Sequence, residues 1–396
     1  MSVYQKASLV QIPSGYKASA AKLYSVVPSS GDGDFTISAD ADATRVNKDG
    51  LIESVAANQA RLNYDFDNPQ DPHLLLEPTR TNYAEYSENF SLWATSTSNG
   101  TVTRTANYAT APDGSNTATR LQASVTGGSG YALVTESTTS FFGDYSSTVY
   151  MKSTNGSNQE VCIYGRNTGN QVVTVTNQWQ RFEINGSSTS GQSNFVNIGV
   201  NLGFVGEDNP IDVLIWGGQI EAGSYASSYI PNTSTGFTTR TEDFCHIPSG
   251  LQNILNTSEG TLFVDVEVPR VSSTGSFERI VLSDQNSSTD RIIFDNYAGN
   301  WRALMISSAG TVSQTIVSVT ANQRIKVAIA YSSTQLRVSY DGNAATTTTG
   351  SYTPSTTLES FKFSNKDGGS KWQGKIYQAM YFNTALTNTE LQTLTS

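Results

Sequence analysis

The feature that most constrains the fold of this chain is a two-residue alternation of apolar and polar side chains in many short runs. Residues 196–202, Val-Asn-Ile-Gly-Val-Asn-Leu, show it most clearly, and residues 160–164, 171–175 and 179–184 are similar. Such a period indicates strands with one buried face. Turn dipeptides such as Asn185-Gly186 recur between the runs. The sequence therefore predicts antiparallel β-sandwiches and argues against a βαβ fold.

The strand-like runs fall into two groups, each of a normal domain size. The first domain is predicted to span residues 74–235. It begins with an apolar triplet ended by Glu77-Pro78 and closes on the dense segment 214–232. A Ser/Thr-rich linker, residues 233–242, leads to a second sandwich at residues 243–396.

Residues 1–73 lack sustained periodicity, and prolines and glycines interrupt their short apolar pieces. We expect this segment to be an extended N-terminal arm that orders against a partner chain or the following domain. Within it, Asn47-Lys-Asp-Gly50 is typical of a hairpin turn. Near the other end of the chain, Thr387-Asn-Thr-Glu390 is a capping box that predicts one short terminal helix.

The composition favours a protein that works outside a cell. Charged residues are only 15% of the chain and the formal net charge is −10, which argues against nucleic acid as the ligand. The first residues lack the apolar core of a signal peptide, and no run of about 18 apolar residues could cross a membrane. We therefore expect synthesis in a host cytoplasm and a location on the surface of a virus particle. Cys162 and Cys245 are expected to remain unpaired, in different domains.

The C-terminal domain resembles laminin-G-like, or concanavalin A-like, lectin domains. The resemblance is carried by residues 324–343, which end in Tyr340-Asp-Gly-Asn343, and by residues 372–391, which contain Gly374-Lys-Ile376 and Ala385-Leu-Thr387. Asp341-Gly342 would form the tight turn of a hairpin. Ile376, Met380 and Phe382 are predicted to share one face of the closing strand.

The middle domain is similar to the jelly-roll sandwiches of carbohydrate-binding modules, through residues 176–182 and 216–223. The series formed by residues 43–53, 74–77 and 216–231 resembles structural proteins of tailed bacteriophages that carry lectin-like C-termini. The resemblance implies a tail fibre, head fibre or capsid decoration protein. Its expected partners are other virion proteins, bound through residues 1–73, and a host-surface glycan.

A candidate ligand site lies in the turn-rich segment Asn296-Tyr-Ala-Gly-Asn-Trp301. Sugars stack on aromatic side chains and hydrogen-bond to amides, so Tyr297 and Trp301, with Asn296 and Asn300, are the predicted glycan-binding residues. Packing of Trp301 beneath the turn is an equally open interpretation. Trp179, Trp216 and Trp372 fall in core-like patterns and are expected to be structural.

Catalysis is not expected, although a polysaccharide depolymerase is the alternative. Asp265 and Glu267 are same-face neighbours on a predicted strand, and a glycosidase needs two facing carboxylates. Residue 263, however, is Phe where the related glucanase pattern Glu-x-Asp-x-x-Glu has its first Glu. The only histidines, His73 and His246, lie near domain boundaries and do not indicate a Ser-His-Asp triad.

No cofactor or metal is predicted. Calcium would need several oxygen ligands in one loop. The available side chains show no dense spacing, namely Asp284, Asn286, Asp290, Asp295, Asn296 and Asp341.

Three functions follow from these observations. The preferred one is a non-enzymatic virion adhesin, which gains avidity as a homo-oligomer, with a trimer as one possible form. The alternatives are the depolymerase and a purely structural capsid decoration.

Overall fold

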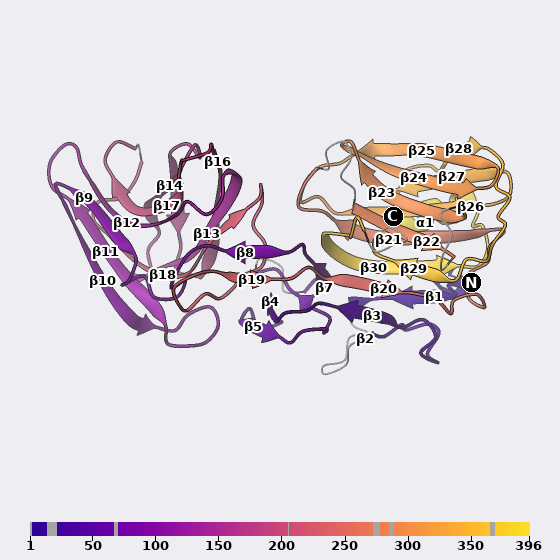
Figure 1. Ribbon diagram of the computed structural model, residues 1–396, viewed down its shortest axis with the longest axis horizontal. Coiled ribbons are helices and arrows are strands. Elements are labelled where there is room, and N and C mark those ends of the chain that lie inside the picture. The colour runs from indigo at the N-terminus through magenta and orange to yellow at the C-terminus, as the bar shows by residue number, and fades with distance from the viewer. Residues whose placement is uncertain are drawn as a thin grey trace. The chain divides into compact units, whose positions relative to one another are not determined.

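The protein is almost entirely β-structure, as predicted. The computed structural model describes residues 2–13, 22–66, 70–204, 206–271, 278–284, 289–364 and 369–396 (Figure 1). The chain forms two compact units. Unit 1 contains Met1–Asp42, Val55–Pro78 and Glu242–Ser396, and unit 2 contains Ala43–Ser54 and Thr79–Thr241. Among the described residues, no helix has both the length and the apolar character needed to span a membrane.

Unit 1 is a sandwich of two eight-stranded sheets. The first, called the β21 sheet, has the order β28 (Thr346–Thr349), β27 (Gln335–Tyr340), β26 (Ile325–Tyr331), β21 (Gly260–Glu267), β30 (Gly374–Phe382), β7 (His73–Leu76) and β6 (Leu62–Asn63), and β1 (Leu9–Gln11) also pairs with β30. The second, called the β22 sheet, has the order β2 (Lys22–Leu23), β3 (Phe35–Ser38), β20 (Phe244–Ile247), β29 (Ser360–Lys362), β22 (Glu278–Ser283), β23 (Arg291–Tyr297), β24 (Asn300–Ser307) and β25 (Gly310–Ser318).

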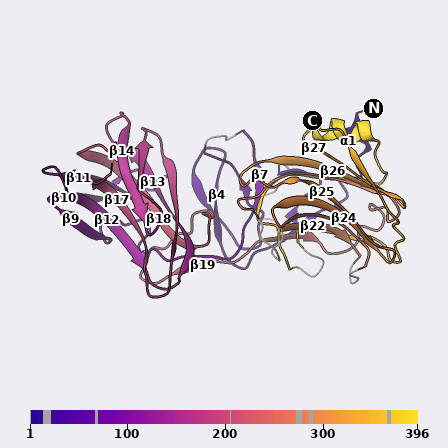
Figure 2. The ribbon, with the colours of Figure 1, turned by 90° about the horizontal axis from the view of Figure 1, so that it is seen from above.

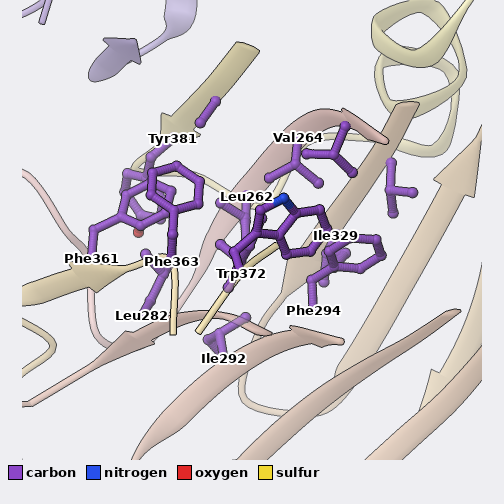
Figure 3. Packing of buried hydrophobic residues seen from close by; sticks show 14 of the residues in the cluster. Leu262, Val264, Leu282, Ile292, Phe294, Ile329, Phe361, Phe363, Trp372 and Tyr381 are labelled. Atoms are coloured by element: carbon purple, nitrogen blue, oxygen red, sulfur yellow. The ribbon is translucent and has the colours of Figure 1, made fainter. Parts of the chain in front are cut away.

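An aromatic core joins the two sheets of unit 1. Trp372, just before β30, lies beside Phe294 of β23 among aliphatic side chains from both sheets (Figure 3). The Phe294 and Trp372 rings stack with centroids 6.2 Å apart. Complete burial of a side chain the size of Phe294 contributes about 1.5–3 kcal/mol, so this cluster is a main source of the stability of unit 1.

The N-terminal segment is not an extended arm. Its strands β1, β2, β3, β6 and β7 pair within the sheets of unit 1. A buried ion cluster fixes one part of this segment, because Arg61 pairs with both Glu77 and Asp243. The Asp243 amide donates to the Glu77 carbonyl at 2.9 Å, and the Glu77 amide donates to Asp243 Oδ2 at 2.8 Å. The prediction of an extended arm is wrong because these short strands pair with strands that are distant in the sequence.

The terminal helix and its cap form as predicted. Helix α1 (Asn388–Thr395) begins at Thr387, whose hydroxyl accepts the Glu390 amide while Glu390 accepts the Thr387 amide. Leu391 and Leu394 pack with Phe263 on the outer face of the β21 sheet. Figure 2 shows α1 beside β26 and β27 in unit 1.

The prediction that Ile376, Met380 and Phe382 share one face of β30 is wrong. Met380 and Phe382 face α1, whereas Ile376 faces the sandwich interior. The cause is an irregularity in the pairing of β21 with β30: Val266 pairs with Ile376 and Asp265 with Gln378, so Tyr377 is an extra residue. A β-bulge of this kind reverses the faces on either side of it.

Unit 2 is a second sandwich, of two five-stranded antiparallel sheets. The β18 sheet has the order β10 (Gly100–Ala109), β11 (Ala118–Val125), β18 (Ile211–Ala222), β13 (Gly143–Ser153) and β16 (Gln180–Ser188). The β17 sheet has the order β15 (Gln171–Val175), β14 (Gln159–Gly165), β17 (Asn194–Asn201), β12 (Tyr131–Thr138) and β9 (Ala94–Ser98). The unit is completed by the pair β8 (Arg80–Asn82) and β19 (Thr238–Arg240) and by the predicted hairpin of β4 (Ala43–Val46) and β5 (Ile52–Val55).

The boundaries of the two sandwiches differ from the predicted ones. The middle domain was expected at 74–235 and the C-terminal domain at 243–396. Unit 2 instead begins after Pro78, ends at Thr241 and includes the hairpin at Ala43–Ser54, while β7 belongs to unit 1.

Candidate functional site

The predicted glycan platform does not form at Trp301. This side chain is 2% exposed, and its ring stacks on Phe294 at 4.8 Å and near Trp372 at 6.0 Å between centroids. A sugar cannot reach either face, so the second interpretation, packing beneath the turn, is the correct one. Trp216 and Trp372 are also buried, as predicted, whereas Trp179 is half-buried.

The three neighbours of Trp301 serve the local structure. Asn296 is buried and donates to Glu278 Oε2 at 3.1 Å. Asn300 donates to the Ala298 carbonyl within the same turn. Only Tyr297 is both aromatic and partly accessible, but the Arg302 guanidinium lies over its ring at 3.9 Å. These residues do not come together as a sugar-binding surface.

The two carboxylates of the depolymerase hypothesis are each held by a cation. Arg324 donates two hydrogen bonds to Asp265, with lengths of 2.6 and 2.7 Å. Glu267 accepts from Tyr377 at 3.1 Å and pairs with Lys375 at 3.1 Å. Both carboxylates are thus engaged by protein side chains, whereas a glycosidase presents its two carboxyl groups to the glycosidic bond.

The histidines and cysteines are also structural. His73 is buried, its Nε2 contacts Asn63 Nδ2 at 3.0 Å, and burial lowers its pKa to about 4. His246 stacks on Phe244 with ring centroids 4.0 Å apart, and burial lowers its pKa. Cys162 and Cys245 are buried free thiols in different units, as expected.

The calcium candidates bind protein groups instead. Asp290 accepts four hydrogen bonds from Ser355 and Thr356, Asp295 pairs with Arg302 and Arg279, and Asp341 accepts the Lys326 amide. Asn286 lies outside the described residues. Within the described ranges, no group of three His, Cys, Asp or Glu side chains could hold a metal ion.

A different surface, on the outer face of the β17 sheet in unit 2, combines aromatic and amide side chains. We call it the Tyr164 surface, and it consists of Tyr131, Tyr164, Asn197, Asn201, Phe204 and Glu207. Strand pairing creates it: Tyr164 of β14 lies opposite Asn197 of β17, and Asn201 lies opposite Tyr131 of β12. All six side chains are partly accessible.

Gly199 lies at the centre of this surface, between Asn197 and Asn201 on β17. The Tyr164 ring starts opposite Asn197, and its hydroxyl accepts from Asn201 Nδ2 at 3.4 Å, so the side chain passes the position of Gly199. A Cβ on Gly199 would lie 2.2 Å from the Ala132 carbonyl oxygen. Phe204 meets the Tyr164 ring edge-on, with centroids 4.9 Å apart.

Glu207 supplies the charged group of the surface. Its Oε2 accepts the Asn201 amide at 3.0 Å, and burial raises its pKa. Its Oε1 is buried and has no hydrogen-bond partner among the described residues. The buried oxygen carries a desolvation cost, and the partly accessible Glu207 side chain gives this end of the surface an acidic group.

These groups are the ones that carbohydrate recognition uses: aromatic faces for C–H groups, and amide and carboxylate groups for hydroxyls. The alternation of residues 160–164 and 196–202 places Tyr164, Asn197 and Asn201 on outward faces. The strand register that unites them is not visible in the sequence.

Comparisons with known proteins give a family match for part of unit 1 and several similar solved structures with low TM-scores. No curated protein shows a significant match to the chain. Among solved structures, the CBM40 domain of Ruminococcus gnavus IT-sialidase is similar at 12% identity and a TM-score of 0.32, over 37% of this chain and 88% of that one. Domains LG4-5 of the mouse laminin alpha1 chain are similar at 8% identity and a TM-score of 0.27, over 62% and 86% of the two chains.

Domain 4 of AbnA, a GH43 extracellular arabinanase from Geobacillus stearothermophilus, gives 15% identity and a TM-score of 0.30, over 44% and 84%. Residues 246–392, within unit 1, match a laminin G family described as the concanavalin A-like lectin/glucanases superfamily.

Proposed function

We propose that this protein is a non-enzymatic adhesin that binds glycan through the Tyr164 surface of unit 2. The observation that carries the proposal is the joining of Tyr131, Tyr164 and Phe204 with two amides and the Glu207 side chain on one partly accessible sheet face. The superfamily matched by residues 246–392 contains lectins and glucanases. The ion pairs of Asp265 and Glu267 favour a binding role for unit 1 as well.

The proposed place of action is the surface of a bacteriophage particle, as a fibre or decoration protein. The low charge content and the resemblance of residues 43–53, 74–77 and 216–231 to phage structural proteins support it. Many copies on one particle would raise the avidity of weak sugar contacts, which also favours a homo-oligomer. A free N-terminal arm is no longer part of this proposal, because strands from residues 1–73 pair within unit 1.

The test is binding of the full-length protein to an array of bacterial surface polysaccharides, with analysis of released oligosaccharides. We expect binding without release and at least a tenfold loss of affinity in Tyr164→Ala, because one aromatic platform is removed. Tyr4→Ala is the control, since Tyr4 is an exposed tyrosine in unit 1. Unchanged binding by Tyr164→Ala contradicts the assigned surface. Released oligosaccharides would show the depolymerase, and no binding to any glycan would leave the structural decoration.

A further inference from the structure

We propose that unit 2 carries a second sugar-binding site, centred on Phe237, that takes a neutral glycan. The inference rests on the proposed function and adds a site and a ligand class to it. The residues that form the site are Tyr83, Glu85, Phe141 and Phe237, and we call them the Phe237 site.

Three aromatic rings form the site. Tyr83 lies between Phe141 and Phe237, with ring centroids 4.6 and 4.9 Å away. Tyr83 and Phe141 are partly buried against the core of unit 2. Phe237 is 49% exposed, which is unusual for a large apolar side chain on a surface rich in hydroxyl and amide groups. The stack thus presents an apolar platform whose base is fixed by the core.

The loop that carries Phe237 is held by hydrogen bonds to the Tyr83–Ser87 segment. The buried Asn232 side chain donates to the Ala84 carbonyl at 2.9 Å and to the Gly236 carbonyl at 2.7 Å. Glu85 Oε1 accepts the Gly236 amide at 3.1 Å, and the Ser87 amide donates to Asn232 O at 2.7 Å. The exposure of Phe237 therefore does not come from a loose loop. A ring fixed in this way loses little conformational entropy when a ligand stacks on it.

The surroundings of the ring select the ligand. Ser234 and Thr235 are exposed beside it and offer hydroxyl groups. The Glu85 carboxylate lies at the base, and the carboxyl group of Glu136 lies beside it because Glu136 accepts the Glu85 amide. Carboxylates accept hydrogen bonds from sugar hydroxyls but repel carboxylate or sulfate groups. The charge therefore fits a neutral glycan.

The size of the platform also fits a sugar better than a protein. A stable protein interface buries about 800 Å² on each partner, whereas this site offers one exposed ring and two partly covered ones. That area matches one or two pyranose rings.

The Phe237 site is separate from the Tyr164 surface. Strand β12 begins at Tyr131 in the Tyr164 surface and ends at Thr138, three residues before Phe141. The Tyr164 surface lies on the outer face of the β17 sheet, whereas Tyr83 and Phe141 of the Phe237 site pack against the core between the sheets of unit 2. Two sites on one domain raise the affinity for a polymer above that for either site alone.

The experiment measures binding of full-length protein to the neutral polysaccharides laminarin, mannan and dextran, and to the anionic polygalacturonate, by affinity electrophoresis. We expect at least one neutral polymer to bind, with a fivefold or larger loss of affinity in Phe237→Ala. Phe142→Ala is the matched control, because Phe142 is 67% exposed in the same unit and, among the described residues, no ring contact joins it to the stack. It should stay within twofold of wild type, and all variants should keep the wild-type melting temperature.

Several outcomes overturn the inference. If Tyr164→Ala loses binding while Phe237→Ala stays within twofold of wild type, the proposed function stands and the second site is refuted. Preferential binding of polygalacturonate through Phe237 refutes the ligand class. If wild type binds none of the four polymers, while the array of bacterial polysaccharides gives binding that Phe237→Ala does not weaken, the second site is again refuted. Absence of binding on both panels removes the proposed function together with the inference.

Discussion

Removal of the buried Arg61 side chain should lower the unfolding free energy of unit 1 by more than a substitution at the surface does. Arg61 is 2% exposed and pairs with Glu77 and Asp243, which are also buried. Arg61→Met keeps the volume of the side chain but leaves two carboxylates without a cation. Loss of one partner of a buried ion pair costs about 3–5 kcal/mol, so we expect the unfolding free energy of unit 1 to fall by that amount at pH 8.

The defect should depend on pH and should be rescued by neutral partners. Burial without a cation disfavours the charged form of a carboxylate, so protonation relieves the cost of the missing Arg61. Stability is then present at low pH and is lost as the pH rises, so the defect shrinks between pH 8 and pH 5. The triple variant Arg61→Met, Glu77→Gln, Asp243→Asn removes the uncompensated charge and should recover more than half of the lost stability.

Urea denaturation followed by hydrogen exchange and mass spectrometry separates unit 1 from unit 2. Arg120→Met is the control, because its pair with Asp212 lies in unit 2 and is partly exposed. It should cost about 1 kcal/mol or less and leave exchange in unit 1 unchanged. A loss below about 1 kcal/mol in Arg61→Met would refute the conclusion that a charged residue of the N-terminal segment is built into this sandwich.

Three further predictions follow. Trp301→Phe should lower the unfolding free energy by about 2 kcal/mol without changing glycan affinity; lost affinity at wild-type stability would return Trp301 to the binding site. Burial raises the pKa of Glu136 to about 7, so the folded state favours its protonated form. Wild type should therefore melt at a lower temperature at pH 8 than at pH 5. Glu136→Gln should reduce this difference in melting temperature, and an unchanged difference would show that Glu136 is not its cause. Wild type and Asp265→Asn should both release no reducing sugar from the bound polysaccharide, because neither acts as a hydrolase. Release by wild type that Asp265→Asn abolishes would contradict the argument from the ion pair of Asp265.

Local patterns in the sequence were sufficient for the elements that depend on neighbouring residues. The alternation in β17, the capping box of α1 and the Asp341-Gly342 turn are short-range signals, and all three form as predicted. The N-terminal segment could not be predicted in this way. Its strands β2 and β6 have two residues each, which is too short for a period to appear.

The site depends still more on distant contacts. The residue spacing of Trp301, Ala303 and Met305 already placed these three on one face, and all are buried. The turn residues before Trp301 indicated an exposed loop instead. Tyr131, Tyr164 and Asn197 meet only through the register of three strands, which the sequence does not encode locally.

Hydrogen exchange of the full-length protein, with and without a polysaccharide that it binds, tests the central claim most directly. We predict slower exchange at β14, at β17 and in the turn with Phe204, and a polymer of unchanged length. Slower exchange confined to unit 1, or a shortened polymer, would contradict binding without cleavage at the Tyr164 surface.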